Sequence, residues 1–272
     1  MGREVCRVRD EQQRENVAAG GSAEATVIEH FDRVTRELHA SLGKVAEGSR
    51  ILFAAFHDDA AFTEASAAVL SHAELARAEK FATADVRQRF VQRRAFRRYA
   101  AMRATGACAG LTLLDFAAEA KGRPWLPAAP RLSWSVSSCR SGMLAAWSPT
   151  AEIGVDLEDR ARVVDCLQLA KRYFAPQETR LVEEAIDEAD RLAIFLRFWC
   201  LKEAVLKAIG EGLAYGLERF AFALEPTVRL VAAPEEQGGV AAFRAAELVG
   251  PPLDAAAATA AVVVRLPPPV SG

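Results

Sequence analysis

Two carboxylates that stand two positions apart are the first residues whose types and spacing point to chemistry. Asp156 and Glu158 lie within the segment IGVDLE at residues 153–158. Because side chains alternate between the two faces of a β-strand, both carboxylates would share one face and the apolar residues the other. Carboxylate oxygens on one face suit a hard cation such as Mg²⁺. An edge strand with a solvated face is the alternative that this segment alone leaves open.

A second group of charges lies in the segment FWCLKEAVLKAIGEGL at residues 198–213. Glu203 and Lys207 are four positions apart and would share one face of a helix, with Lys202 beside them. They are either a surface pair worth about 0.2–0.5 kcal/mol or a site in which Glu203 is a third metal ligand and Lys207 lies near a phosphate. A carboxylate on a helix is held more firmly than one on a loop, which favours metal geometry.

The third feature is basic. Residues 85–106 read DVRQRFVQRRAFRRYAAMRATG and contain seven arginines. Arg89, Arg93 and Arg97 recur at a spacing of four and would line one side of a helix. Arginine forks onto phosphates and carboxylates, so an anionic ligand or acidic partner is one interpretation and a solvated helix face the other.

Two short segments add polar groups. KGRPWLP at residues 121–127 contains Gly122-Arg123-Pro124, a fixed turn with one cation. SSCRSG at residues 137–142 places hydroxyls at a strand end, followed by Arg140. The second segment either binds an anion or is a plain hairpin loop.

Hydrophobic periodicity predicts the elements that must position these residues. We expect strands at 51–56, 132–138, 143–147, 153–158 and 220–224, and helices at 26–45, 71–82, 85–104 and 190–209, with a helical region over 164–188 that is interrupted near Pro176. Gly43 and Gly210 are the expected ends of two of the helices. Strands and helices mixed in both halves, without a nucleotide-binding glycine loop, predict an α+β fold with antiparallel sheets.

Composition narrows the function classes. The chain has 272 residues, 51% apolar and 26% charged, with a net charge of −2. This charge argues against a nucleic-acid binder, and the lack of a long apolar run argues against a membrane protein. Five scattered cysteines predict reduced thiols and a cytoplasmic location. The four histidines all precede residue 73, so chemistry in the C-terminal two thirds would use carboxylates, Lys, Arg or hydroxyls.

In this order, the basic helix, the GRP turn, IGVDLE and FWCLKEAVLK resemble the motifs of the Sfp-type 4′-phosphopantetheinyl transferases. The resemblance covers about residues 51 to 225. It implies two similar α+β subdomains related by a pseudo-twofold, acting as a monomer. We expect an extension at 1–48 with one amphipathic helix, an N-terminal subdomain at 49–147 and a C-terminal subdomain at 148–272 that carries the metal-binding motifs.

The resemblance also implies an activity. Enzymes of this family use Mg²⁺ or Mn²⁺ to transfer 4′-phosphopantetheine from coenzyme A to a serine of an apo acyl or peptidyl carrier protein, releasing 3′,5′-ADP. Coenzyme A lies in the cleft between the two halves. The two-unit form favours secondary metabolism or broad use, without naming the carrier. A non-catalytic coenzyme A or carrier-protein binding module and a Mg²⁺-dependent phosphohydrolase are the alternatives.

Matching positions carry the family's roles. Asp156, Glu158 and Glu203 fall on the metal ligands, with Asp156 also counted as catalytic and Glu203 as the base for the carrier serine. Lys207 falls on the lysine at the leaving phosphate, and Lys202 on a neighbouring phosphate contact.

The remaining positions that the resemblance assigns to coenzyme A come from both halves of the chain. They are Arg77 and Arg89 near the 3′-phosphate, Gly122, Arg123 and Pro124 near the adenine and 3′-phosphate, and Ser137 at the strand end. Ser138 stands where the family has a phosphate-contacting histidine, and the hypothesis is that Ser138 and Arg140 replace that contact.

Overall fold

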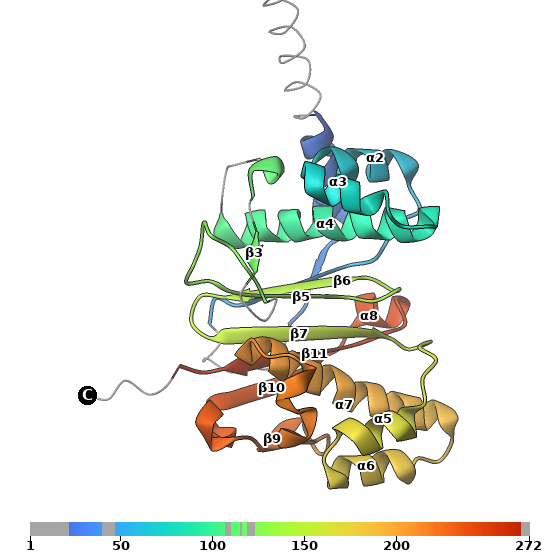
Figure 1. Cartoon of the computed structure of the whole chain (residues 1–272), viewed down its shortest axis with the longest axis vertical. Coiled ribbons are helices and arrows are strands. Elements are labelled where there is room, and N and C mark those ends of the chain that lie inside the picture. Colours follow the sequence, from blue (N-terminus) through green and yellow to red (C-terminus); the bar gives the residue numbers. More distant parts are fainter. Residues whose placement is uncertain (1–21, 40–46, 107–109, 115, 119–122, 268–272) are drawn as a thin grey trace, which may run out of the picture. The chain divides into compact units, whose positions relative to one another are not determined.

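The computed structural model describes residues 22–39, 47–106, 110–114, 116–118 and 123–267 (Figure 1). Contacts group the chain into two units, Met1–Thr35 with Phe56–Leu114 and Arg36–Ala55 with Asp115–Gly272. Gly122, and most of the predicted extension at 1–48, lie outside the described residues. The contact grouping does not test the subdomain boundaries expected at 48 and 147, which stay a prediction.

The secondary structure of the first unit consists of helices within its described residues. Its elements are a helix over residues 22–34, α2 (Ala60–Ala68), α3 (His72–Ala78), α4 (Ala84–Thr105) and the 3₁₀ turn η2 (Leu111–Leu113). Phe31 is buried, with its ring centroid 5.2 Å from that of Phe62 and 5.5 Å from that of Phe96. The helix over 22–34 therefore packs on α2 and α4 through its apolar side.

The second unit contains all the strands of the described residues. They are β1 (Arg36–Glu37), β2 (Arg50–Ala54), β3 (Ala117–Ala118), β4 (Pro124–Trp125), β5 (Ser133–Ser138), β6 (Met143–Ser148), β7 (Glu152–Asp159), β8 (Ala221–Ala223), β9 (Arg229–Ala232), β10 (Phe243–Leu248) and β11 (Ala258–Arg265). Antiparallel pairing gives a sheet β1-β2-β6-β5, a sheet β10-β11-β7 and the two-stranded pairs β3-β4 and β8-β9.

Helices of the second unit cover one side of the β10-β11-β7 sheet (Figure 1). They are α5 (Cys166–Tyr173), α6 (Pro176–Glu183) and α7 (Glu188–Ile209). Helix α8 (Pro251–Ala255) precedes β11, and its Leu253 packs in the core on the opposite face of this sheet. The unit also contains the 3₁₀ turns η3 (Leu213–Tyr215), η4 (Leu217–Arg219), η5 (Glu235–Gln237) and η6 (Val240–Ala242). Asp187 caps the start of α7 by accepting a hydrogen bond from the Asp190 amide, and Gly210 ends it at a φ of 71°.

Strand β7 has two buried faces. Ile153, Val155 and Leu157 pack in a core with residues of β2 and β6. Gly154 and Asp156 alternate with them and face α7, where Gly154 lies directly against the backbone of Ala204 and Ala208. A side chain at position 154 would separate the strand from the helix, so glycine allows the closest packing at this point.

Serine hydroxyls join β5 to β7, which are edge strands of different sheets. The Ile153 amide donates to Ser133 Oγ at 2.8 Å, and the Val155 amide donates to Ser135 Oγ at 3.1 Å. Side chains thus take the place of a backbone ladder and fix the register of the two strands.

The α+β fold class is confirmed, whereas the pseudo-twofold stays a prediction. The helix expected over 26–45 is wrong at its C-terminal end, because the helix ends at residue 34 and Arg36–Glu37 pair with β2. Leu38 packs instead with Ile51 and Phe53 in the sheet core. Helix α2 was not expected. Cys139, Cys166 and Cys200 are free thiols, and no helix of the described residues is both long and apolar enough to cross a membrane.

Candidate active site

Three elements bring polar groups together around Asp156. Its side chain is 6% exposed, and Oδ1 accepts hydrogen bonds from Lys207 Nζ at 2.7 Å and Ser137 Oγ at 2.8 Å. Lys207 Nζ also donates to Ser137 Oγ at 3.1 Å. Strand β7, helix α7 and strand β5 therefore each contribute one member to a hydrogen-bonded triangle.

The other two predicted carboxylates lie beside this triangle. Glu158 accepts a hydrogen bond at 2.5 Å from Arg162, whose guanidinium lies 5.2 Å from the centre of the Trp199 ring. Glu203 is half-buried on α7, one helical turn before Lys207. Burial, and then the charge of Asp156, raise the pKa of both Glu158 and Glu203. The group thus holds three mutually repelling carboxylates.

Lys207 is the cation that pairs with Asp156. Burial opposes its charge, but the charge of Asp156 and the hydrogen bond to it outweigh burial and raise the pKa of Lys207. Its ammonium is therefore firmly protonated. It neutralises Asp156 from the same helix face that carries Glu203.

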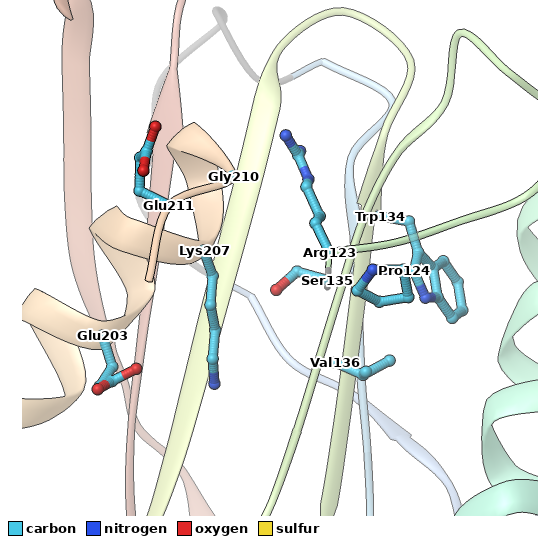
Figure 2. A pocket seen from close by; sticks show the side chains of 9 residues that line it. All are labelled: Arg123, Pro124, Trp134, Ser135, Val136, Glu203, Lys207, Gly210 and Glu211. Atoms are coloured by element: carbon cyan, nitrogen blue, oxygen red, sulfur yellow. The ribbon is translucent and has the colours of Figure 1, made fainter. Parts of the chain in front are cut away.

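A cavity of about 230 Å³ opens beside the triangle (Figure 2). Its walls are formed by Arg123, Pro124, Trp134, Ser135, Val136, Glu203, Lys207, Gly210 and Glu211. Figure 2 shows Lys207 and Glu203 projecting from α7, with Arg123 and Ser135 on the other side of the cavity. The Arg123 guanidinium donates to Ser133 Oγ at 2.8 Å, which fixes this cation at the cavity wall.

As arranged here, no three His, Cys, Asp or Glu side chains of the described ranges lie close enough together to hold a metal ion. One observation nevertheless fits a cation at this place. Asp156 Oδ2 is buried and has no hydrogen-bond partner among the described residues. A buried carboxylate oxygen without a partner is costly, and hard oxygen donors of the Asp and Glu type are those that Mg²⁺ prefers.

Lys202 lies outside the lining of this cavity, and its contacts contradict its assignment as a phosphate contact. Its side chain is fully buried, and Nζ donates to Leu217 O at 2.9 Å, Phe220 O at 2.5 Å and Glu178 Oε2 at 2.7 Å. An ammonium has three N–H donors, so this side chain has none left for a ligand. Lys202 projects from α7 into the helical layer and away from the cavity.

The other predicted positions fall into two groups. Ser138 and Arg140 lie at and just beyond the end of β5 and do not line the cavity. Arg77 and Arg89 belong to the first unit. Arg77 lies over the Phe90 ring at 5.8 Å, and Arg89 pairs with Asp85 at 2.9 Å. Their assignment to a 3′-phosphate stays a prediction.

Sequence patterns alone missed several residues that contact the predicted site residues or the elements carrying them. Arg162, four residues after Glu158, was a detectable signal because this spacing brings opposite charges together within a turn. Glu178 and Gly154 had no such signal, since their partners lie 24 and 50 positions away in sequence (178 to 202 and 154 to 204).

Comparisons with known proteins bear on the same region. A family model described as the 4′-phosphopantetheinyl transferase superfamily matches residues 152–260. The 4′-phosphopantetheinyl transferase HetI of Nostoc sp. is 38% identical over 164 residues, which cover 59% of this chain and 68% of the relative.

Two further relatives match shorter parts. The human L-aminoadipate-semialdehyde dehydrogenase-phosphopantetheinyl transferase is 31% identical over 39% of this chain and 38% of its own length. The 4′-phosphopantetheinyl transferase of Bacillus subtilis is 29% identical over 41% of this chain and 48% of its own length. The chain thus covers about two thirds of HetI and less than half of each of these two.

Proposed function

The chain belongs to the 4′-phosphopantetheinyl transferase superfamily, and from this premise we propose that it transfers the 4′-phosphopantetheine group of coenzyme A to a serine of an apo acyl or peptidyl carrier protein. The names of the relatives support the group transferred. The observation that carries the proposal is the triangle of Asp156, Lys207 and Ser137 beside a cavity walled by Glu203 and Arg123. It combines cations and carboxylates as phosphoryl transfer requires.

In the proposed reaction the serine oxygen of the carrier forms a bond to the β-phosphorus of coenzyme A. The bond from that phosphorus to the bridging oxygen breaks, and 3′,5′-ADP leaves with the electron pair. Glu203 takes the serine proton, directly or through a water. Lys207, one turn further along α7, neutralises the charge that develops on the leaving phosphate.

Asp156, Glu158 and Glu203 are the residues that would hold Mg²⁺ or Mn²⁺. When bound, such an ion supplies charge neutralisation at the pyrophosphate. Arg123 and Pro124 form part of the wall for the nucleotide portion, and Ser137 orients Asp156 and Lys207 toward each other. The same proposal includes a monomeric, cytoplasmic enzyme of secondary metabolism or broad carrier range.

The test is incubation with coenzyme A, Mg²⁺ and a panel of apo carrier proteins, followed by intact-mass measurement of each carrier. We expect one carrier to gain the mass of a phosphopantetheine group and 3′,5′-ADP to form in equal amount. Glu203→Gln should abolish the mass shift and keep the fold, whereas Glu184→Gln, the same change at an exposed site, should have no effect.

Two other outcomes would support the competing functions. Binding of coenzyme A with no mass shift on any carrier would favour a non-catalytic binding module. Release of phosphate or pantetheine without a carrier would favour a phosphohydrolase. A Glu203→Gln variant with full transfer activity would refute the role of Glu203.

A further inference from the structure

Lys202 and Glu178 form an ion pair that is completely closed to solvent. Both side chains are 0% exposed, and Lys202 Nζ lies 2.7 Å from Glu178 Oε2. The two carbonyl oxygens of Leu217 and Phe220 accept the other lysine donors. The ammonium therefore has a fixed position set by three oxygens.

Both carboxylate oxygens of Glu178 also have hydrogen-bond partners. Its Oε1 accepts a hydrogen bond from the Phe222 amide at 2.8 Å, and its Oε2 accepts one from the Ala175 amide at 2.8 Å. The pair thus connects the start of α6, the segment from η4 into β8, and the middle of α7. Each of these contacts is directional, unlike the apolar contacts around them.

Stability alone does not account for this pair. Replacing a buried ion pair with apolar side chains of similar volume is often neutral or stabilising, and α7 already buries many apolar side chains in this layer. The pair adds hydrogen bonds of fixed direction to the apolar packing of α7. Around Gly154, α7 meets β7 through Ala204 and Ala208, and these small side chains offer little interlocking shape to stop the helix from sliding or turning at this point.

We propose that the Lys202–Glu178 pair sets the axial and rotational position of α7, and thereby places Glu203 and Lys207 at the cavity. Glu203 is the next residue, and Lys207 follows within two turns of a rigid helix, so a rotation at Lys202 displaces both. Lys202 and Glu178 are positioning residues that touch no ligand. The effect on transfer rests on the proposed function, while the effect on α7 does not.

The experiment compares Lys202→Met, Glu178→Gln and the double variant Lys202→Met/Glu178→Met. Each single change leaves a buried group with a mismatched partner, so we expect a lower Tm in both. The double variant removes both charges and should recover part of the Tm, since the amides of Phe222 and Ala175 and the carbonyls of Leu217 and Phe220 still lose their side-chain partners. Its kcat should nevertheless stay reduced by about tenfold to a hundredfold, because a displacement of about 1 Å can cost a hundredfold in rate.

A second measurement does not depend on catalysis. Hydrogen–deuterium exchange of the amides at residues 203–209 should be faster in the double variant than in the wild type. The KM for coenzyme A should change less than kcat, because Arg123 on the opposite wall does not depend on α7 for its hydrogen bond. Matched controls are Lys171→Met and Glu183→Gln, which remove partners of an exposed Lys–Glu pair between α5 and α6 and should change neither kcat nor exchange.

Wild-type kcat together with wild-type exchange in the double variant would overturn the inference, since the pair would then contribute to stability only. Failure of the double variant to fold would also overturn it, because the pair would then be needed for the fold itself. If the wild type modifies no carrier, the proposed function fails, and exchange over residues 203–209 still decides whether the pair positions α7.

Discussion

Gly154→Ala tests how closely β7 and α7 must approach for the site to form. An added Cβ would lie well inside 3.0 Å of Ala204 O and Ala208 N, and at 3.0 Å from Ala208 Cα. All three are backbone atoms of α7, so no side-chain rotation relieves the clash. The helix must move outward, or β7 must move into the sheet core.

The expected cost follows from that displacement. Forcing one methyl group into a packed interior destabilises a protein by about 1–3 kcal/mol. A shift of about 1 Å between Asp156 on the strand and Lys207 on the helix would break their 2.7 Å hydrogen bond. Misplacement on this scale costs about a hundredfold in rate. We therefore expect Gly154→Ala to lose both stability and most of the transfer activity.

Urea denaturation followed by tryptophan fluorescence would measure the first effect, and the carrier mass assay the second. Gly212→Ala is the matched control, because an added Cβ there meets nothing within 4 Å and the φ of −106° suits alanine. This control should unfold at the same or a slightly higher urea concentration. A Gly154→Ala protein with wild-type stability would refute the close packing, and one with wild-type activity would refute its role in the site.

Four further outcomes are expected. Lys207→Met should lower kcat by about a hundredfold or more, as removal of one charge-stabilising donor does elsewhere; a wild-type kcat would contradict its role at the leaving phosphate. Chelation with EDTA should stop transfer, and added Mg²⁺ or Mn²⁺ should restore it; transfer that survives exhaustive chelation would argue against the metal. Arg140→Ala should raise the KM for coenzyme A, and an unchanged KM would end the hypothesis that it replaces a histidine. Burial and then the charges of His57 and Arg33 lower the pKa of His30 to about 4, so the unfolded chain binds a proton between about pH 6.5 and 4 that the folded chain refuses. Stability should therefore fall as pH falls through this window. Tm should depend less on pH in His30→Phe than in the wild type. The same pH dependence in both proteins would contradict the lowered pKa of His30 as its cause.

The local patterns that repeat within a few residues were predictable. Alternation along residues 153–158 predicted that Asp156 and Val155 lie on opposite faces of the strand, as they do in β7. The spacing of four predicted that Glu203 and Lys207 share one face of a helix, as they do in α7. Gly210 was expected to end the helix and does so. These features depend on backbone geometry that is the same in every strand and helix.

Contacts between distant segments were not predictable from the same patterns. The direction in which Lys202 projects depends on the angle at which α7 lies on the sheet, and that angle is set by tertiary packing. The family resemblance implies a phosphate contact for Lys202, whereas the side chain points to Glu178. The helix that ends at residue 34 was overextended for a similar reason, because Leu38 fits a helical spacing equally well and is recruited by the sheet core.

The serine bridges between β5 and β7 also complete the hydrogen bonding at the edges of two sheets. Each of these strands ends its own sheet, and an exposed edge with free amides is a template for pairing with another chain. The hydroxyls of Ser133 and Ser135 accept hydrogen bonds from two amides of β7. Replacing them with alanine would leave the buried amides of Ile153 and Val155 without these acceptors. Each hydroxyl thus completes the hydrogen bonding of one amide at the edge of β7.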